Sequence, residues 1–141
     1  MKKYDVFISY SRKDKAIVDE IRQLLDANSI TYWLDTEKIR MGSEFMGDIV
    51  DAIEKSDLVL FISSVNSNAS HNVAKEISIA DKFMKTILPV RIDDAPYSSV
   101  IEYDLIGVDY IDYSKRSNES LEKLRKSILA RLLISDTLAA L

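Results

Sequence analysis

Residues 57–63 read Asp57-Leu58-Val59-Leu60-Phe61-Ile62-Ser63, five apolar residues between two polar ones. An uninterrupted apolar run of this length is typical of a strand that helices cover on both faces, because a strand with one face in water alternates apolar and polar residues. A second run, Val6-Phe7-Ile8, predicts another such strand near the start of the chain. Together the two runs predict an α/β fold.

Short apolar segments alternate with segments of helical periodicity along the rest of the chain, as in βαβ units around a parallel sheet. The predicted strands are Tyr4–Tyr10, Ile30–Leu34, Asp57–Ser63, Thr86–Ile92 and Val108–Ile111. Pro89 lacks the amide hydrogen that a sheet ladder needs, so it argues against full pairing of the fourth strand but not against the strand itself.

Helices are predicted where apolar residues recur every three or four positions. The residues that define them are Ile17, Ile21, Leu24 and Leu25; Phe45, Ile49 and Ile53; Val73, Ile77, Ala80 and Met84; and Leu121, Leu124, Ile128 and Leu132. Residues 95–107 are expected to form a loop with one short helical turn. The alternation predicts a flavodoxin-like three-layer sandwich, with a five-stranded parallel sheet in the order 2-1-3-4-5 and helices on both faces.

The length of 141 residues corresponds to one domain. We expect residues 1–133 to form it. Residues 134–141 are apolar for a free end, so we expect this tail to dock on the domain or to begin a linker to a part outside the sequence.

The composition excludes several classes of function. The chain has no Cys, one His and three Gly, which excludes thiol nucleophiles, iron–sulfur clusters and multi-histidine metal sites. The spacing Gly42 to Gly47 continues with Asp48-Ile49 where a phosphate-binding loop needs Lys and then Ser or Thr. The net charge of −4 argues against nucleic acid as a partner, and no run reaches the ~18 apolar residues of a membrane span. We therefore expect a cytoplasmic protein without a metal, a resident cofactor or a membrane partner.

Ligands of doubly wound sheets bind beyond the carboxyl ends of the strands. A phosphoacceptor receiver would need acidic residues there, but the first strand ends in Ser9-Tyr10 and the third in Ser63-Ser64. The receiver hypothesis therefore fails. The hydroxyls of Ser9 and Ser11 resemble a flavin phosphate cradle only weakly.

Residues 4–10, Tyr-Asp-Val-Phe-Ile-Ser-Tyr, closely resemble the opening motif of the TIR (Toll/interleukin-1 receptor) domain family. The resemblance extends over about residues 4 to 130. The segments that carry it are Trp33-Leu34-Asp35, Ile39 to Phe45, Ala52 to Ser56, Val59 to Ser63 and Lys75-Glu76-Ile77.

The resemblance implies one of two functions. Many bacterial, plant and axon-degeneration members cleave NAD+ and release nicotinamide, leaving ADP-ribose or a cyclic isomer, whereas receptor and adaptor members signal through TIR–TIR contacts. The enzymes carry an essential glutamate on the helix after the third strand, four residues beyond a Trp. Glu76 takes that place here, and Asn72 stands where the Trp is expected. We expect an NAD+ glycohydrolase activated by self-association; the alternative is a non-catalytic interaction module or host-mimicking effector.

Helical geometry offers an independent test of Glu76. At ~100° per residue, Val73, Ile77, Ala80 and Met84 form a narrow stripe, and Glu76 lies about 70° from its centre. This places the carboxylate at the edge of the apolar face, next to the crevice. A first-turn glutamate that simply favours the helix dipole is the alternative.

The resemblance also implies roles for residues that would surround NAD+, with a sensor domain, fused or separate, as a further partner. Arg12 would meet the diphosphate or its ribose, or is a surface charge. Phe45 would cover the nicotinamide or pack in the core. Trp33 would form a wall, and Asp35 would bind ribose or cap its loop. Tyr10, Ser11 and Asn72 would line the site.

Overall fold

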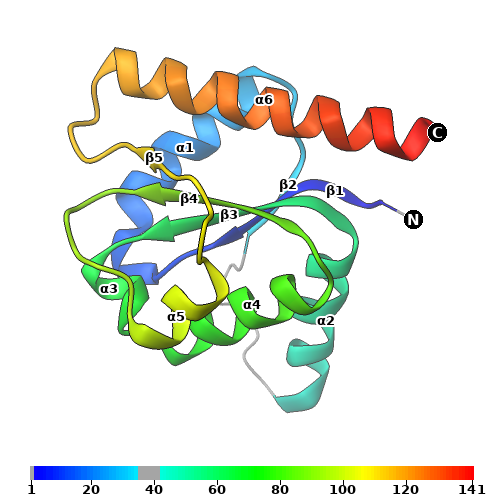
Figure 1. Ribbon diagram of the computed structural model, residues 1–141, viewed down its shortest axis with the longest axis horizontal. Helices are drawn as coiled ribbons and strands as arrows, with labels where there is room; N and C mark the ends of the chain where they lie inside the picture. The colour runs from blue at the N-terminus through cyan, green and yellow to red at the C-terminus, as the bar shows by residue number, and fades with distance from the viewer. Residues whose placement is uncertain (1, 35–41) are drawn as a thin grey trace.

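The five strands form one parallel sheet in the order β2-β1-β3-β4-β5 (Figure 1). This computed structural model describes residues 2–34 and 42–141, with side chains for 2–34 and 46–141. The strands are β1 Tyr4–Ser9, β2 Tyr32–Trp33, β3 Ser56–Ser63, β4 Thr86–Arg91 and β5 Ile111–Asp112. The predicted strand order and flavodoxin-like architecture are therefore confirmed.

Helices cover both faces of the sheet (Figure 1). They are α1 Lys15–Ala27, α2 Gly42–Glu54, α3 Val65–Asn68, α4 His71–Lys82, α5 Ser99–Asp104 and α6 Asn118–Ala140, with a short 3-10 helix, η1 Arg12–Asp14. α1 and α6 pack on one face, and α2, α4 and α5 pack on the other. The expected short helical turn between residues 95 and 107 is α5, whereas α3 was not predicted.

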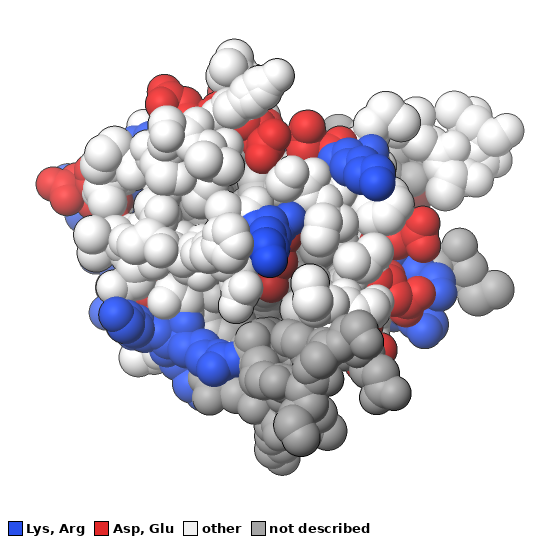
Figure 2. All heavy atoms as spheres, turned by 90° about the horizontal axis from the view of Figure 1, so that it is seen from below, with Lys and Arg blue, Asp and Glu red and all other residues white. Residues whose placement is uncertain are grey.

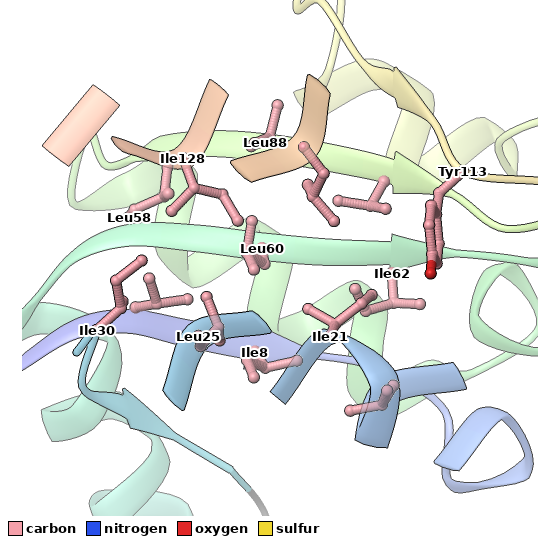
Figure 3. Close-up of a cluster of buried hydrophobic side chains, with 14 of the residues drawn as sticks. Ile8, Ile21, Leu25, Ile30, Leu58, Leu60, Ile62, Leu88, Tyr113 and Ile128 are labelled. Carbon is pink, nitrogen blue, oxygen red and sulfur yellow. The ribbon is translucent and has the colours of Figure 1, made fainter. Parts of the chain in front are cut away.

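The position of β3 between two layers of helices explains why its apolar run is uninterrupted. Leu58, Leu60 and Ile62 point into the cluster formed with α1 and α6 (Figure 3). Val59 and Phe61, which alternate with them, point into the cluster formed with α2, α4 and α5. Successive side chains of a strand face opposite sides, so a strand in the middle layer must be apolar at every position.

Pro89 lies inside β4 and pairs in register with Phe61. The amide of Ile92 donates to Ser63 of β3, and the carbonyl of Arg91 accepts from Tyr113 on the β5 side. Odd-numbered residues of β4 therefore direct their backbone groups toward β5. Pairing with β5 begins only at Val90, so the missing amide hydrogen of Pro89 falls where β4 still has a free edge.

α4 ends earlier than its apolar spacing predicts. The helix stops at Lys82, and Met84 has φ +56° and is 90% exposed. The amide of Lys85 donates to the carbonyl of Ala80, and that of Met84 to Asp81. This pair of bonds is the Schellman motif, which reverses the chain through a left-handed residue. The prediction that Met84 belongs to the buried stripe is wrong for this reason.

α6 runs without a break across the expected boundary between residues 133 and 134. Leu132 is its last buried residue, and Leu133, Ile134 and Leu138 are exposed. Lys2 forms ion pairs with Asp5, Asp57 and Asp136, and so connects the last turns of α6 to the sheet. No helix within the described residues is both long and apolar enough to span a membrane.

The left-handed residue at the end of α4 leads to a stability prediction. Met84→Gly removes a β-carbon from a conformation that disfavours it, and should raise the free energy of unfolding by about 0.5–1 kcal/mol. Met46, which is also exposed but lies within α2, provides the matched control. Met46→Gly should lower stability by about 1 kcal/mol. Urea denaturation followed by circular dichroism measures both, and a loss of stability in both variants would contradict the prediction.

Candidate active site at the carboxyl edge of the sheet

A cleft of about 500 Å³ opens at the carboxyl end of β1, beside the start of α4. Its lining comes from the turn after β1 and from the first turns of α4: Tyr10, Ser11, Arg12, Lys13, Ser70, Asn72, Val73 and Glu76. The structure therefore brings together five of the residues that the sequence suggested for the site. Lys13, Ser70 and Val73 are additional.

Glu76 lies where the helical geometry places it. Ser70 caps α4 by accepting a hydrogen bond from the amide of Val73, and Val73 and Ile77 anchor the helix in the apolar cluster under the sheet. Glu76, between them on the edge of this face, is only 8% exposed and lines the cleft. Its carboxylate is therefore largely withdrawn from water, whereas its catalytic role stays a prediction.

Ser9 holds the Glu76 carboxylate. The Ser9 hydroxyl donates a hydrogen bond of 2.6 Å to Oε1 of Glu76, and Ser9 is completely buried at the end of β1. Sequence reasoning did not assign Ser9 to the site. The signal was the two-residue period of the strand, because Phe7 packs on the side of α4 and Ser9 must face the same way.

Two cationic side chains, those of Arg12 and Lys13, also line the cleft. Arg12 and Lys13 lie in η1 and are exposed. Ser11 caps this turn by accepting a hydrogen bond from the amide of Lys13. The lining of the cleft thus combines a buried carboxylate with exposed positive charge.

Three predicted site residues do not contribute to the described cleft. Trp33 stacks on Phe7, with ring centroids 5.1 Å apart and planes 7° apart, and packs against the apolar cluster under the sheet. It is not among the lining residues. Asp35 lies outside the described residues, and Phe45 lies in α2 with a side chain outside them.

The loop after β4 lies at the same edge of the sheet, but its side chains make contacts within the fold. Asp93 accepts hydrogen bonds from the amides of Val65 and Ala95. Arg91 lies over the rings of Tyr97 and Tyr110, and burial raises the pKa of the Tyr97 hydroxyl. Within the described residues, no group of three or more acidic or histidine side chains is placed to hold a metal ion.

Much of the face formed by α2, α4 and α5 is uncharged in Figure 2, with Lys and Arg at its lower left, near its centre and toward its right. Val100, Tyr103 and Ile106, on and just after α5, are exposed. None of the three lines the cleft.

Two curated relatives match part of this chain. A protein of Cytobacillus dafuensis, provisionally named cyclic ADP-D-ribose synthase TIR2, is 28% identical over 113 residues, which are 74% of this chain and 30% of that protein. The TMV resistance protein N of Nicotiana glutinosa is 25% identical over 99 residues, 66% of this chain and 9% of that protein. The chain thus spans less than a third of the length of either relative.

A family model and solved structures agree with these matches. The model described as the TIR domain matches residues 6–128. The TIR domain of the Toll-related receptor TRR-2 from Hydra magnipapillata superposes with a TM-score of 0.72 at 21% identity, covering 89% of this chain and 98% of that one. At this identity the likeness is one of fold.

Proposed function

The chain belongs to the TIR domain family, and from this premise we propose that it is an NAD+ glycohydrolase. It cleaves the bond between nicotinamide and ribose, with Glu76 as the essential carboxylate. NAD+ is the substrate, and the reaction uses no metal or resident cofactor. The products are nicotinamide and ADP-ribose or a cyclic isomer of ADP-ribose. Self-association of TIR domains activates the reaction.

The observation that carries this proposal is the position of Glu76. It is a nearly buried carboxylate that lines a cleft large enough for part of a nucleotide, and a buried serine orients it. The name of the Cytobacillus dafuensis relative refers to a cyclic ADP-ribose product, which supports the same chemistry for this chain.

One carboxylate is enough for this reaction because of the leaving group. Most glycosidases need a general acid to protonate the departing oxygen. In NAD+ the nicotinamide nitrogen is already cationic. When its bond to C1′ breaks, both electrons pass to that nitrogen and nicotinamide departs neutral. No proton has to be delivered to it.

The positive charge then develops on the ribosyl group, next to Glu76. A fixed carboxylate stabilises an oxocarbenium-like centre electrostatically, and it does so more strongly where water is excluded. Water attacks C1′ and loses a proton to give ADP-ribose. Attack by an adenine nitrogen of the same molecule gives the cyclic product instead. Both products therefore arise from one site.

The rest of the cleft suits the remainder of the substrate. Arg12 and Lys13 offer positive charge to the diphosphate, as basic side chains do at phosphate sites. Tyr10 and Ser11, in the turn between Ser9 and Arg12, also line the cleft and are the side chains that this proposal places against the ribose. Asn72, exposed at the start of α4, forms a polar rim in place of a Trp.

Replacing Glu76 tests the proposal directly. Glu76→Gln keeps the size of the side chain but removes its charge, and should lower nicotinamide release by about 10²–10³-fold, the effect of losing one preorganised charge-stabilising group. Incubation of concentrated protein with NAD+, followed by chromatography of the products, measures the rate.

Glu102 is the matched control, since it is an exposed glutamate in the first turn of α5. Glu102→Gln should release nicotinamide at the parent rate. Activity that survives in Glu76→Gln would disprove the role of Glu76. A parent protein that releases no nicotinamide, even when crowded or clustered, would favour the non-catalytic interaction module.

Removing the Ser9 hydroxyl should slow the reaction without abolishing it. A hydrogen bond to a charged group contributes about 1.5–3 kcal/mol, so Ser9→Ala should lower kcat by roughly 10–100-fold. Ser56, the first residue of β3, is the control, because it is equally buried and its hydroxyl also donates a 2.6 Å hydrogen bond, to the carbonyl of Ala52 in α2. If Ser56→Ala reduced kcat as strongly, the loss would reflect stability and not the orientation of Glu76.

A further inference from the structure

A second carboxylate is buried close to the cleft. Asp14, the last residue of η1, is only 9% exposed. Its Oδ2 accepts a 2.5 Å hydrogen bond from the Ser64 hydroxyl, and its Oδ1 accepts a 2.9 Å hydrogen bond from the Asn66 side-chain amide. Asp14 does not line the cleft, but it shares a single turn with Arg12 and Lys13, which do.

The groups that hold Asp14 are themselves firmly placed. Ser64 is buried, and its hydroxyl caps α3 by accepting from the amide of Ser67, whose hydroxyl accepts in return from the amide of Ser64. Asn68, at the end of α3, binds Ser63 and also accepts from the amide of Ser98. α3 therefore forms a rigid platform for the Asp14 carboxylate.

Capping of α1 does not explain why an aspartate stands at position 14. Asp14 occupies the N-cap position of α1, where an aspartate usually accepts a hydrogen bond from the helix backbone. Its side chain makes no such bond and instead crosses to α3. Burying a carboxylate is costly, and the hydrogen bonds that offset this cost connect η1 with α3 and its cap.

The connection between η1 and α3 links two segments that line the cleft. η1 carries Arg12 and Lys13, and α3 leads directly into α4, which carries Glu76. We propose that Asp14 is a positioning residue that fixes Arg12 relative to Glu76, so that the site selects substrates with a diphosphate next to the ribosyl group. This inference rests on the proposed function, since it concerns how the same cleft recognises NAD+.

A binding measurement separates this inference from turnover. All proteins in this measurement carry Glu76→Gln, and the protein with this change alone is the parent. Calorimetry measures how the parent, Arg12→Ala, Asp14→Ala and the double variant bind ADP-ribose and the phosphate-free nicotinamide riboside. We expect each single variant to weaken ADP-ribose binding by about tenfold, the effect of one charged hydrogen bond. The double variant should be no weaker than Arg12→Ala alone, because both changes remove the same contact. Binding of nicotinamide riboside should change less than twofold.

Asp14→Asn provides the rescue. Its amide oxygen still accepts from Asn66, and its NH₂ group donates to the Ser64 hydroxyl, so ADP-ribose affinity should stay within threefold of the parent. Additive losses in the double variant, equal losses for both ligands, or no ADP-ribose binding by the parent would each overturn the inference. If ADP-ribose binds as expected but the wild-type chain releases no nicotinamide from NAD+, the proposed function fails and the positioning role of Asp14 stands.

Discussion

The placement of β3 between two layers of helices constrains the whole molecule. Its residues from Leu58 to Ile62 have no access to water on either face, so polar groups can follow the strand only at its ends. Ser63 and Ser64 come directly after Ile62, and the Ser64 hydroxyl donates a hydrogen bond to Asp14 in η1, just after β1. The polar side chains of the candidate site therefore lie at the carboxyl edge of the sheet, because the buried part of the strand has no room for them.

Serine hydroxyl groups stabilise the buried carboxylates at this edge of the sheet. A buried carboxylate loses hydration that only strong hydrogen bonds replace. Ser9 donates to Glu76, and Ser64 donates to Asp14, both over short distances. Each serine is fixed by regular structure, Ser9 by the end of β1 and Ser64 by the cap of α3. The backbone thus determines where both negative charges lie.

The sequence predicted the sheet because apolar runs and helical spacing report burial directly. It also predicted Glu76 at the edge of the apolar face of its helix, because the rotation of ~100° per residue is enough to place a side chain around a helix. It missed α3, which is too short to show a period, and it extended α4 to Met84, because spacing does not reveal where a chain reverses. Trp33 was expected beside the crevice, but its register with Phe7 in the neighbouring strand turns it into the apolar layer. These differences depend on the neighbouring strand or on the turn that ends a helix, which the residue itself does not reveal.

The position of Trp33 bears on which ligands would suit the cleft. Trp33 is committed to Phe7, and the α4 position where the family's enzymes carry a Trp is the exposed Asn72. Among the described lining residues, Tyr10 is therefore the aromatic ring, beside two cations and one buried carboxylate. A single ring offers modest stacking energy, whereas a diphosphate placed against guanidinium and ammonium groups would gain charged hydrogen bonds. Under the proposed function, recognition in this part of the cleft would depend more on charge than on stacking, and the hydrogen bonds of Asp14 to Ser64 and Asn66 would help to position that charge.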